Sequence, residues 1–323
     1  MILVEEGRLY LDAPVVEYLP WWAAGDARKE SVTVRHLLLH RAGLPPFRRF
    51  YLEMEGEDAY RSAIGQLELE YDPGTQTVYS DIGFMTLAFI VEQLSGQGLD
   101  EFLDARVWDR LGMNNTRFRP SGDDRARIAP TEVDTTFRNT HIHGVVHDEN
   151  AYAIGGVAGH AGLFSNAADL AVLAQTLLDG GSMAGCEQES SGNARGDSDT
   201  TLPAGAPSGE SICAPGVVGQ VRLVSEETVR AFTQRFDSQA SRALGWDTPS
   251  GRSSAGDYFT RGAYGHTGFT GTSIWIDPEL DLFVVLLTNR VNPTRDNNRH
   301  VPLRRAVHDL AALAIMDLEV ALR

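Results

Sequence analysis

The stretch Tyr264-Gly-His-Thr-Gly-Phe-Thr-Gly-Thr-Ser273 runs directly into the apolar segment Ile274-Trp-Ile-Asp277. A second apolar and β-branched run, Leu282-Phe-Val-Val-Leu-Leu-Thr288, follows a turn rich in Pro and Asp. Two such runs on either side of a turn predict a β-hairpin. Glycines at the start of a strand indicate that another backbone or a ligand comes close, so the segment is either a structural bend or part of a site.

A second informative segment, Tyr79-Ser-Asp81, lies far upstream of this hairpin. It follows Tyr71-Asp-Pro-Gly-Thr75, a turn in which Pro fixes φ and Gly supplies an unusual backbone conformation. Residues 82–94 are apolar on nearly every face, which is the pattern of a buried central helix. Tyr79 is therefore predicted to lie on a loop that is held at the start of a rigid helix.

Capping residues and periodicity predict the other elements. Helices are expected over residues 33–40, 100–111, 167–178, 226–232 and 302–322, with a strand-like segment at 242–247. Helices fill the middle of the chain and strands crowd its C-terminal end. The predicted fold class is therefore α+β, an antiparallel sheet flanked by helices together with a mainly helical lobe.

The chain is expected to form one domain over residues 1–323. Its helical lobe takes about residues 30–180, and its C-terminal sheet and helix take about residues 217–323. Between them, residues 182–216 have little to bury, because Ser, Gly, Ala, Pro, Asp and Glu dominate, and this predicts a disordered insertion. Cys186 and Cys213 fall in this insertion, where two incidental thiols are favoured over a disulfide or a metal site.

Composition excludes several classes of protein. Apolar residues make up 42% of the chain, which is enough for a sizeable core, and no apolar run is long enough to span a membrane. The net charge of −16 argues against nucleic acid as a partner. We expect a small-molecule or peptide substrate and no cofactor, and the oligomeric state stays open.

Four histidines with acids nearby occur in a stretch that has few periodic signals: His141, His143, His147 and His160. Such a group leaves a zinc hydrolase as one alternative. The stretch has no Cys and no helical His-x3-His, which favours polar lining or structural histidines instead. His36 and His40 share one helix face, where core or capping roles are favoured over a metal pair.

Further motifs occur along the chain: Val32-Thr-Val-Arg-His-Leu-Leu38, Gly43-Leu-Pro45, Pro73-Gly-Thr75, Leu111-Gly-Met113, Gly162-Leu-Phe-Ser165 and His266-Thr-Gly268. Together with Tyr79-Ser-Asp81, they make the chain resemble the serine β-lactamase and penicillin-binding-protein-like hydrolases, in the class C β-lactamase and family VIII esterase branch. The resemblance runs over nearly the whole chain outside the insertion. It implies a β-lactamase/transpeptidase-like fold and acyl transfer on an ester, amide or peptide through a covalent acyl-enzyme.

The resemblance also implies roles for the upstream residues that match. Tyr79 takes the position of the family's proton-relay tyrosine, a catalytic group. Asp81 stands where the family usually has Asn, which adds charge near the site and removes an N–H donor. Asp81 and His160 are both candidates for lining the substrate site.

The downstream motif carries the other implied roles. His266 stands where the family usually has Lys, and it is followed by the matching Thr267 and Gly268. The Phe269 N–H would form one half of the oxyanion hole. Because histidine is a weaker anion anchor than lysine, strong β-lactamase activity is not expected.

The family's nucleophile motif, Ser-x-x-Lys, is not found in this chain. Lys29 is the only lysine, and Asp26 rather than a serine stands three residues before it. Two explanations compete: the start lies late, on an internal Met inside the nucleophile helix, or the gene encodes a truncated relative without activity. The helix-tail pattern of residues 1–6 favours the first.

In either case we expect this chain to be an N-terminally truncated serine hydrolase that forms no acyl-enzyme as it stands. A non-catalytic binding module is the alternative. Without the family's N-terminal helix and first strands, sheet edge and core would be uncovered and stability poor. No signal peptide is visible, and the compartment, cytoplasmic or periplasmic, stays open.

Overall fold

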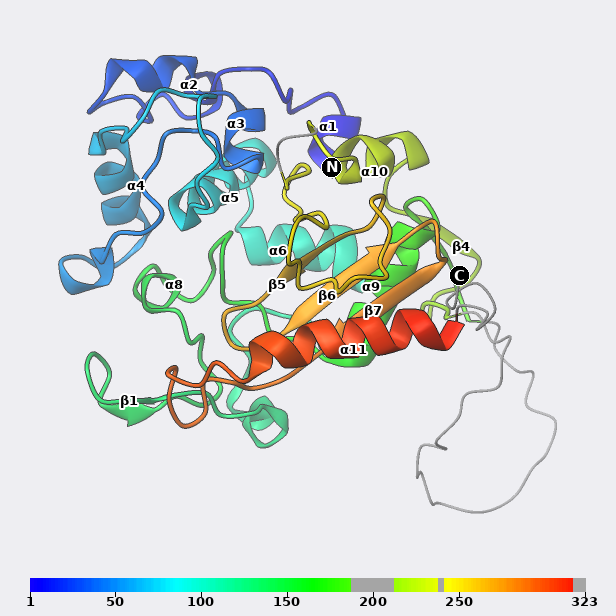
Figure 1. The fold of residues 1–323 in the computed structure, drawn as a ribbon. Coiled ribbons are helices and arrows are strands. Elements are labelled where there is room, and N and C mark those ends of the chain that lie inside the picture. The colour runs from blue at the N-terminus through cyan, green and yellow to red at the C-terminus, as the bar shows by residue number, and fades with distance from the viewer. Residues whose placement is uncertain (187–211, 238–240, 316–323) are drawn as a thin grey trace.

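The computed structural model describes residues 1–186, 212–237 and 241–315. A three-stranded antiparallel sheet lies between helices α9 (Ala167–Leu178) and α11 (His300–Ile315), and both helices contact strand β7 (Leu282–Leu286) (Figure 1). A mainly helical lobe lies beside this sheet (Figure 1). The expected α+β arrangement is confirmed.

The remaining elements are short. The helical segments are α1 (Ile2–Glu5), α2 (Val15–Tyr18), η1 (Ala27–Ser31), α3 (Val34–Leu38), η2 (Phe50–Leu52), α4 (Glu57–Gln66), α5 (Asp81–Ser95), α6 (Leu99–Leu103), η3 (Asp104–Trp108), α7 (Asp109–Leu111), η4 (Gly122–Arg127), α8 (Glu149–Ala153) and α10 (Glu226–Thr233). Two pairs of short strands are antiparallel, β1 (Val133–Asp134) with β2 (Thr140–His141) and β3 (Ser182–Ala184) with β4 (Gln220–Arg222).

The sheet contains the predicted hairpin and one further strand. Strand β6 (Ser273–Asp277) pairs on one side with β7 and on the other with β5 (Tyr264–Thr267), in the register His266 to Ile274. A Cβ on Gly265 would come within 2.3 Å of the Ile274 carbonyl oxygen. Glycine is thus required in β5 by the close approach of a neighbouring backbone.

Helix α5 is the buried central helix that the sequence predicts. The Ser80 hydroxyl caps it by accepting a hydrogen bond from the Gly83 N–H, and Gly96 ends it in the left-handed conformation at φ 72°. Ile82 and Ile90 are fully buried in the main apolar core. This rigid support fixes the loop immediately before α5 at a defined place.

Three predicted boundaries differ from the structure. The helix expected from residue 100 begins at Leu99 after Gly98 and is interrupted by a π-helical turn, η3. The expected strand at 242–247 is a tight turn, in which Arg242 and Asp247 form an isolated bridge. The last helix starts at His300, and its expected end lies outside the described residues.

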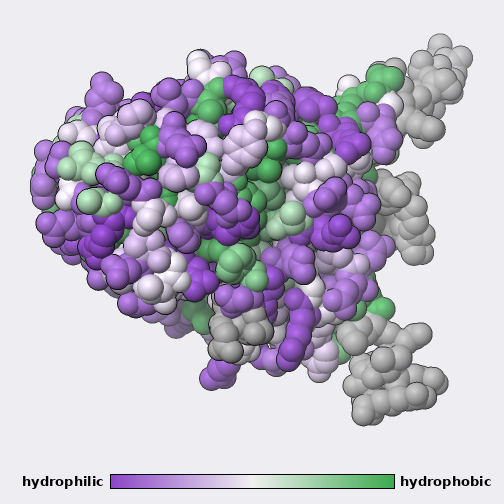
Figure 2. Space-filling view, turned by 90° about the horizontal axis from the view of Figure 1, so that it is seen from above, coloured by the Kyte–Doolittle hydropathy of each residue, from purple (hydrophilic) through white to green (hydrophobic). Residues whose placement is uncertain are grey.

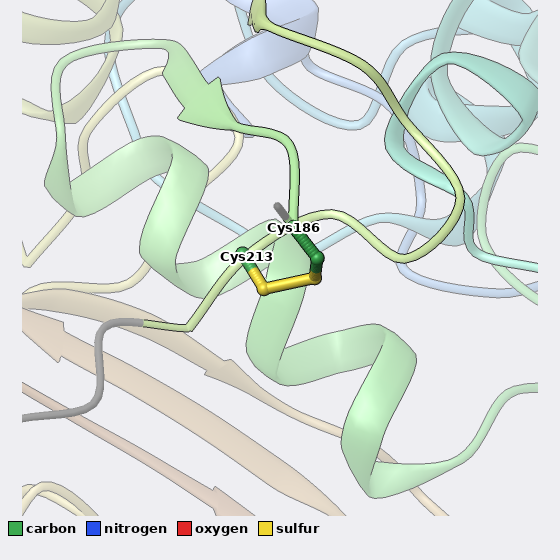
Figure 3. Close-up of a disulfide and its surroundings, with 2 residues drawn as sticks. All are labelled: Cys186 and Cys213. Atoms are coloured by element: carbon green, nitrogen blue, oxygen red, sulfur yellow. A yellow bond between two sulfur atoms is a disulfide. The ribbon is translucent and has the colours of Figure 1, made fainter. Parts of the chain in front are cut away.

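Cys186 and Cys213 form a disulfide, so the prediction of two incidental thiols is wrong (Figure 3). Gly185 bridges Ala214, and the Cys186 N–H donates to the Ala214 carbonyl at 3.1 Å. This backbone pairing holds the two cysteine Cα atoms 4.9 Å apart, within the range that a disulfide requires. Both ends of the expected insertion are therefore ordered, and residues 187–211 lie outside the described residues.

Lys29, the only lysine, has a structural position. It is fully buried, its Nζ donates to the carbonyls of Ile64 at 2.7 Å and Gly65 at 2.9 Å, and it lies 4.3 Å from the Trp22 ring centroid. It thus caps the C-terminal end of α4. Burial lowers the pKa of Lys29 to about 8, although Asp26 acts in the opposite direction.

Candidate active site

Tyr79 lies on the loop immediately before α5. Its ring packs on His40, with 4.5 Å between centroids, and its side chain is 44% exposed. The next residue fixes the loop: the Ser80 N–H donates to His40 Nδ1 at 3.1 Å, and the Ser80 hydroxyl donates to the Pro45 carbonyl at 2.7 Å. Tyr79 is therefore fixed by its packing on His40 while its side chain stays partly exposed.

The structure brings Tyr79 and His266 together. Their ring centroids lie 6.0 Å apart, although the residues are far apart in the sequence. His266 comes from strand β5, and its Nδ1 lies 2.9 Å from the Thr267 carbonyl oxygen. Because a carbonyl only accepts, Nδ1 carries the proton and donates, which leaves Nε2 as an acceptor in the neutral ring.

Burial sets the protonation of both groups. Burial, followed by the Asp81 carboxylate, raises the pKa of Tyr79 to about 12, with Arg242 acting against them. Burial also lowers the pKa of His266; the bond to Thr267 opposes this, and Arg242 adds to the lowering. At pH 7 the site therefore holds a protonated phenol and a neutral imidazole.

The glycine-rich turn that directly follows β5 carries Phe269. The Phe269 ring is 58% exposed and lies 4.1 Å from the Arg290 guanidinium and 5.7 Å from the His147 ring. Within the described part of the chain, the Phe269 N–H donates to no acceptor. Thr267 and Gly268 connect β5 to this turn, so the predicted motif is contiguous with the site.

Asp81 and His160 lie together on the α5 side. The His160 side chain is buried, its Nε2 lies 3.0 Å from Asp148 Oδ1, and its Nδ1 has no partner among the described residues. Burial raises the pKa of Asp81. His160 opposes this increase, and the Asp148 carboxylate adds to it. Two carboxylates and one unused ring nitrogen therefore meet beside the Tyr79 loop.

Arg242 belongs to the same site, although no local sequence pattern indicated it. Its guanidinium carbon lies 5.6 Å from the Tyr79 ring centroid. Its carboxylate contact with Asp247 is long, at 3.9 Å. Arg242 comes from the tight turn at 242–247, and only the pairing of that turn with Gly265 of β5 brings it to the site.

Replacing Arg242 with Gln is expected to raise the pKa of His266 toward its ordinary value, because the substitution removes a positive charge that disfavours the imidazolium. The measurement is a pH titration of the His266 ring resonances by NMR. Arg230→Gln, on an exposed face of α10, is the matched control and should leave the titration unchanged. If the titration curves of wild type and Arg242→Gln coincide, the Arg242 guanidinium does not act on His266 as stated here.

The four histidines considered for zinc have separate partners. His141 Nε2 lies 3.5 Å from Asn292 Nδ2, and His143 Nε2 contacts the Ile128 carbonyl at 2.8 Å. His147 Nε2 contacts Glu132 at 3.0 Å, and His160 contacts Asp148. Residues 1–186, 212–237 and 241–315 contain no group of three or more His, Cys, Asp or Glu arranged to hold a metal. His36 closes a capping box on α3 and His40 is buried, as predicted for core or capping residues.

An apolar cavity of about 430 Å³ opens between α3, α5, α6 and α10 and reaches His160. Its walls are almost entirely aliphatic and aromatic, and include Leu38, Phe84, Val91 and Phe232. Seen from above, apolar side chains gather near the middle of a largely hydrophilic face (Figure 2).

No helix in the described ranges is long and apolar enough to cross a membrane.

Comparison with known proteins gives a consistent result. The family model described as Beta-lactamase matches residues 1–309. A protein of Escherichia coli K12, provisionally named D-alanyl-D-alanine carboxypeptidase, is 34% identical over 315 residues, which cover 89% of this chain. A relative of the same name in Salmonella schwarzengrund is 32% identical. The chain spans 64% and 65% of the length of these two relatives.

Solved structures have the same fold. A penicillin-binding protein homolog from Caulobacter crescentus aligns with a TM-score of 0.66 at 18% identity, covering 98% of this chain and 79% of that chain. A family VIII carboxylesterase aligns with a TM-score of 0.65 at 17% identity, again over 98% and 79%.

Proposed function

Because this chain belongs to the beta-lactamase family, we propose that its site serves acyl transfer on an ester, amide or peptide through a serine acyl-enzyme. The single observation that carries the proposal is the meeting of Tyr79 and His266 at 6.0 Å, beside a turn whose Phe269 N–H has no acceptor within the described ranges. A proton-transfer group and an oxyanion donor are the two parts of acyl-transfer chemistry that a protein must hold rigidly.

The nucleophile in this proposal comes from a Ser-x-x-Lys segment that the 323 residues do not contain. Ser80, the serine beside Tyr79, is 3% exposed and uses its hydroxyl to bond Pro45, so it is not a candidate. The apolar cavity beside α5 is suited to an apolar helix. Asp81 and Asp148 lie near His160, which the cavity reaches, and would pair with the lysine of such a segment.

In the proposed reaction, the serine oxygen forms a bond to the substrate carbonyl carbon, and the carbonyl oxygen takes the electron pair. The Phe269 N–H and the serine N–H stabilise that oxyanion. The serine proton passes through the Tyr79 phenol to the leaving group, whose bond to the carbonyl carbon breaks. Water then hydrolyses the acyl-enzyme. With its pKa near 12, the Tyr79 phenol starts protonated. A lysine ammonium nearby would lower the pKa of this phenol and so make the transfer of its proton easier.

The substrate class follows from the charge of the site. His266 is neutral at pH 7, so it is a poor anchor for the carboxylate of a β-lactam. The name of the relatives adds peptides ending in D-alanyl-D-alanine to the candidates. Small esters and such peptides are therefore proposed ahead of β-lactams.

The test is covalent labelling of the serine by a fluorophosphonate probe, on the 323-residue chain and on the same chain joined to a Ser-x-x-Lys segment. Labelling that depends on the joined segment supports the hydrolase. A joined, folded chain that never labels would favour the non-catalytic binding module.

A further inference from the structure

The turn from Gly268 to Thr272 has an unusual set of hydrogen bonds: each of its five carbonyl oxygens accepts at least one. Arg304 Nη2 donates to Gly268 at 2.6 Å and to Thr272 at 2.7 Å. The Arg290 side chain donates through Nε to Phe269 at 2.7 Å, and its backbone N–H donates to Thr270 at 2.8 Å. The Thr288 hydroxyl donates to Gly271 at 2.6 Å.

These bonds fix the direction of the amides. In a trans peptide, the carbonyl and the following N–H point in opposite directions. Because the Gly268 carbonyl points to Arg304, the Phe269 N–H points away from it, and the Thr270 N–H likewise points away from the Arg290 side chain. Within the ranges that the structure describes, neither N–H has an acceptor. Successive unpaired N–H groups in a turn form a concave anion site.

Neither arginine forms an ion pair with a carboxylate of the described chain, although Glu132 lies near enough to act on Arg290. Neither Arg290 nor Arg304 lies within 4.0 Å of a carboxylate there, whereas Arg295 contacts both Glu132 and Glu149. Arg304 is only 7% exposed, and its Nε is buried without a partner. The Arg304 guanidinium is thus largely kept out of water behind the turn, where its field reaches the turn amides with little screening. Arg290 is partly exposed, and its guanidinium lies against the Phe269 carbonyl.

We propose that Arg290 and Arg304 are positioning residues that hold the 268–272 turn as an anion site, with the Phe269 and Thr270 amides as donors and the two guanidiniums as the charge behind it. The inference rests on the proposed function for the identity of its anion, the oxyanion of acyl transfer. Binding of an anion to the turn is independent of any nucleophile, so it is measurable on the 323-residue chain.

The experiment is a titration of the ¹⁵N-labelled chain with inorganic phosphate, followed through the Phe269 and Thr270 amide resonances. In wild type, phosphate should shift both amides. Arg304→Gln and Arg290→Gln should each weaken phosphate binding by about tenfold, because each removes a nearby charge and a turn-fixing donor. Arg299→Gln, an exposed arginine just before α11, makes the same change in net charge and should leave the affinity within about twofold.

A second substitution separates charge from structure. Arg304→Lys keeps the charge and should retain most of the affinity that Arg304→Gln loses. The inference is wrong if Arg304→Lys loses as much phosphate affinity as Arg304→Gln. It is also wrong if phosphate shifts neither amide resonance in wild type, or if both Gln variants bind phosphate as tightly as wild type. If Arg304→Gln does not fold, Arg290→Gln carries the comparison. Serine labelling of the joined wild-type chain is a separate measurement, so labelling without phosphate binding would reject this inference while leaving the proposed function in place.

Discussion

Replacing Tyr79 with Phe in a chain joined to a Ser-x-x-Lys segment will slow serine acylation by about 10²–10⁴-fold, the usual contribution of a positioned proton-transfer group. The substitution removes only the hydroxyl. The ring keeps its contacts with His40 and Arg242, at 4.5 Å and 5.6 Å, so the loop before α5 should stay in place. A decrease of this size in the acylation rate would therefore show that the Tyr79 hydroxyl transfers the proton.

The measurement is the rate of fluorophosphonate labelling under single-turnover conditions. Tyr152→Phe is the matched control, because Tyr152 is 43% exposed against 44% for Tyr79 and lies on helix α8, away from the loop that carries Tyr79. It should label at the wild-type rate. A Tyr79→Phe rate within about threefold of wild type would assign proton transfer to another group.

Replacing Lys29 with Met should remove a pH dependence of stability on the order of 3 kcal/mol, at about 1.4 kcal/mol per pKa unit. The folded pKa is about 8 and the ordinary value is 10.5, so between these pH values the unfolded chain binds the proton that the folded chain has lost. Raising the pH through this range then favours the folded state. Below pH 8 both states are protonated and the cost of burying the charge is fully present.

Urea unfolding at several pH values from 7 to 11 tests this. The free energy of unfolding of wild type should rise relative to Lys29→Met as the pH increases from 8 to 10.5. Tyrosines also titrate in the upper part of this range, but they are common to both proteins and cancel in the difference. Arg252→Met, at an exposed position, should run parallel to wild type. Parallel curves for Lys29→Met would show that Lys29 is not buried as a cation.

The parts of the fold that the sequence predicted are those with local signals. The helices expected from residues 33, 167 and 226 have the capping residues Thr33, Asn166 and Ser225, and each of these side chains accepts a hydrogen bond from an N–H three residues later. The β6–β7 hairpin was predicted because both strands and their turn are contiguous. The pairing of β5 with β6 follows the same continuity.

Other features had no local signal because they depend on contacts between distant segments. Arg242 reaches Tyr79 only through a turn that pairs with β5, and Arg304 reaches the 268–272 turn from the last helix. The disulfide depends on the pairing of Gly185 with Ala214, which composition did not indicate. Tyr79 and His266 were the exception, because a family resemblance supplied the long-range information that the local pattern lacks.

The roles of these site residues stay predictions, whereas the fold class and the family are confirmed. The structure adds a His266 with a lowered pKa, a half-buried Asp81 and an apolar cavity to the residues that the resemblance implied. All three agree with the acyl transfer that we propose, and the Ser-x-x-Lys motif that this proposal requires is not found among the 323 residues.

The most direct measurement of that claim is the stoichiometry of fluorophosphonate labelling by intact mass, followed by peptide mapping. The account predicts negligible labelling of the 323-residue chain. It predicts about one probe per chain, on the serine of the added motif, when the chain is joined to the Ser-x-x-Lys segment of a relative, and none when that serine is Ala. Stoichiometric labelling of a serine within the unjoined chain would contradict it.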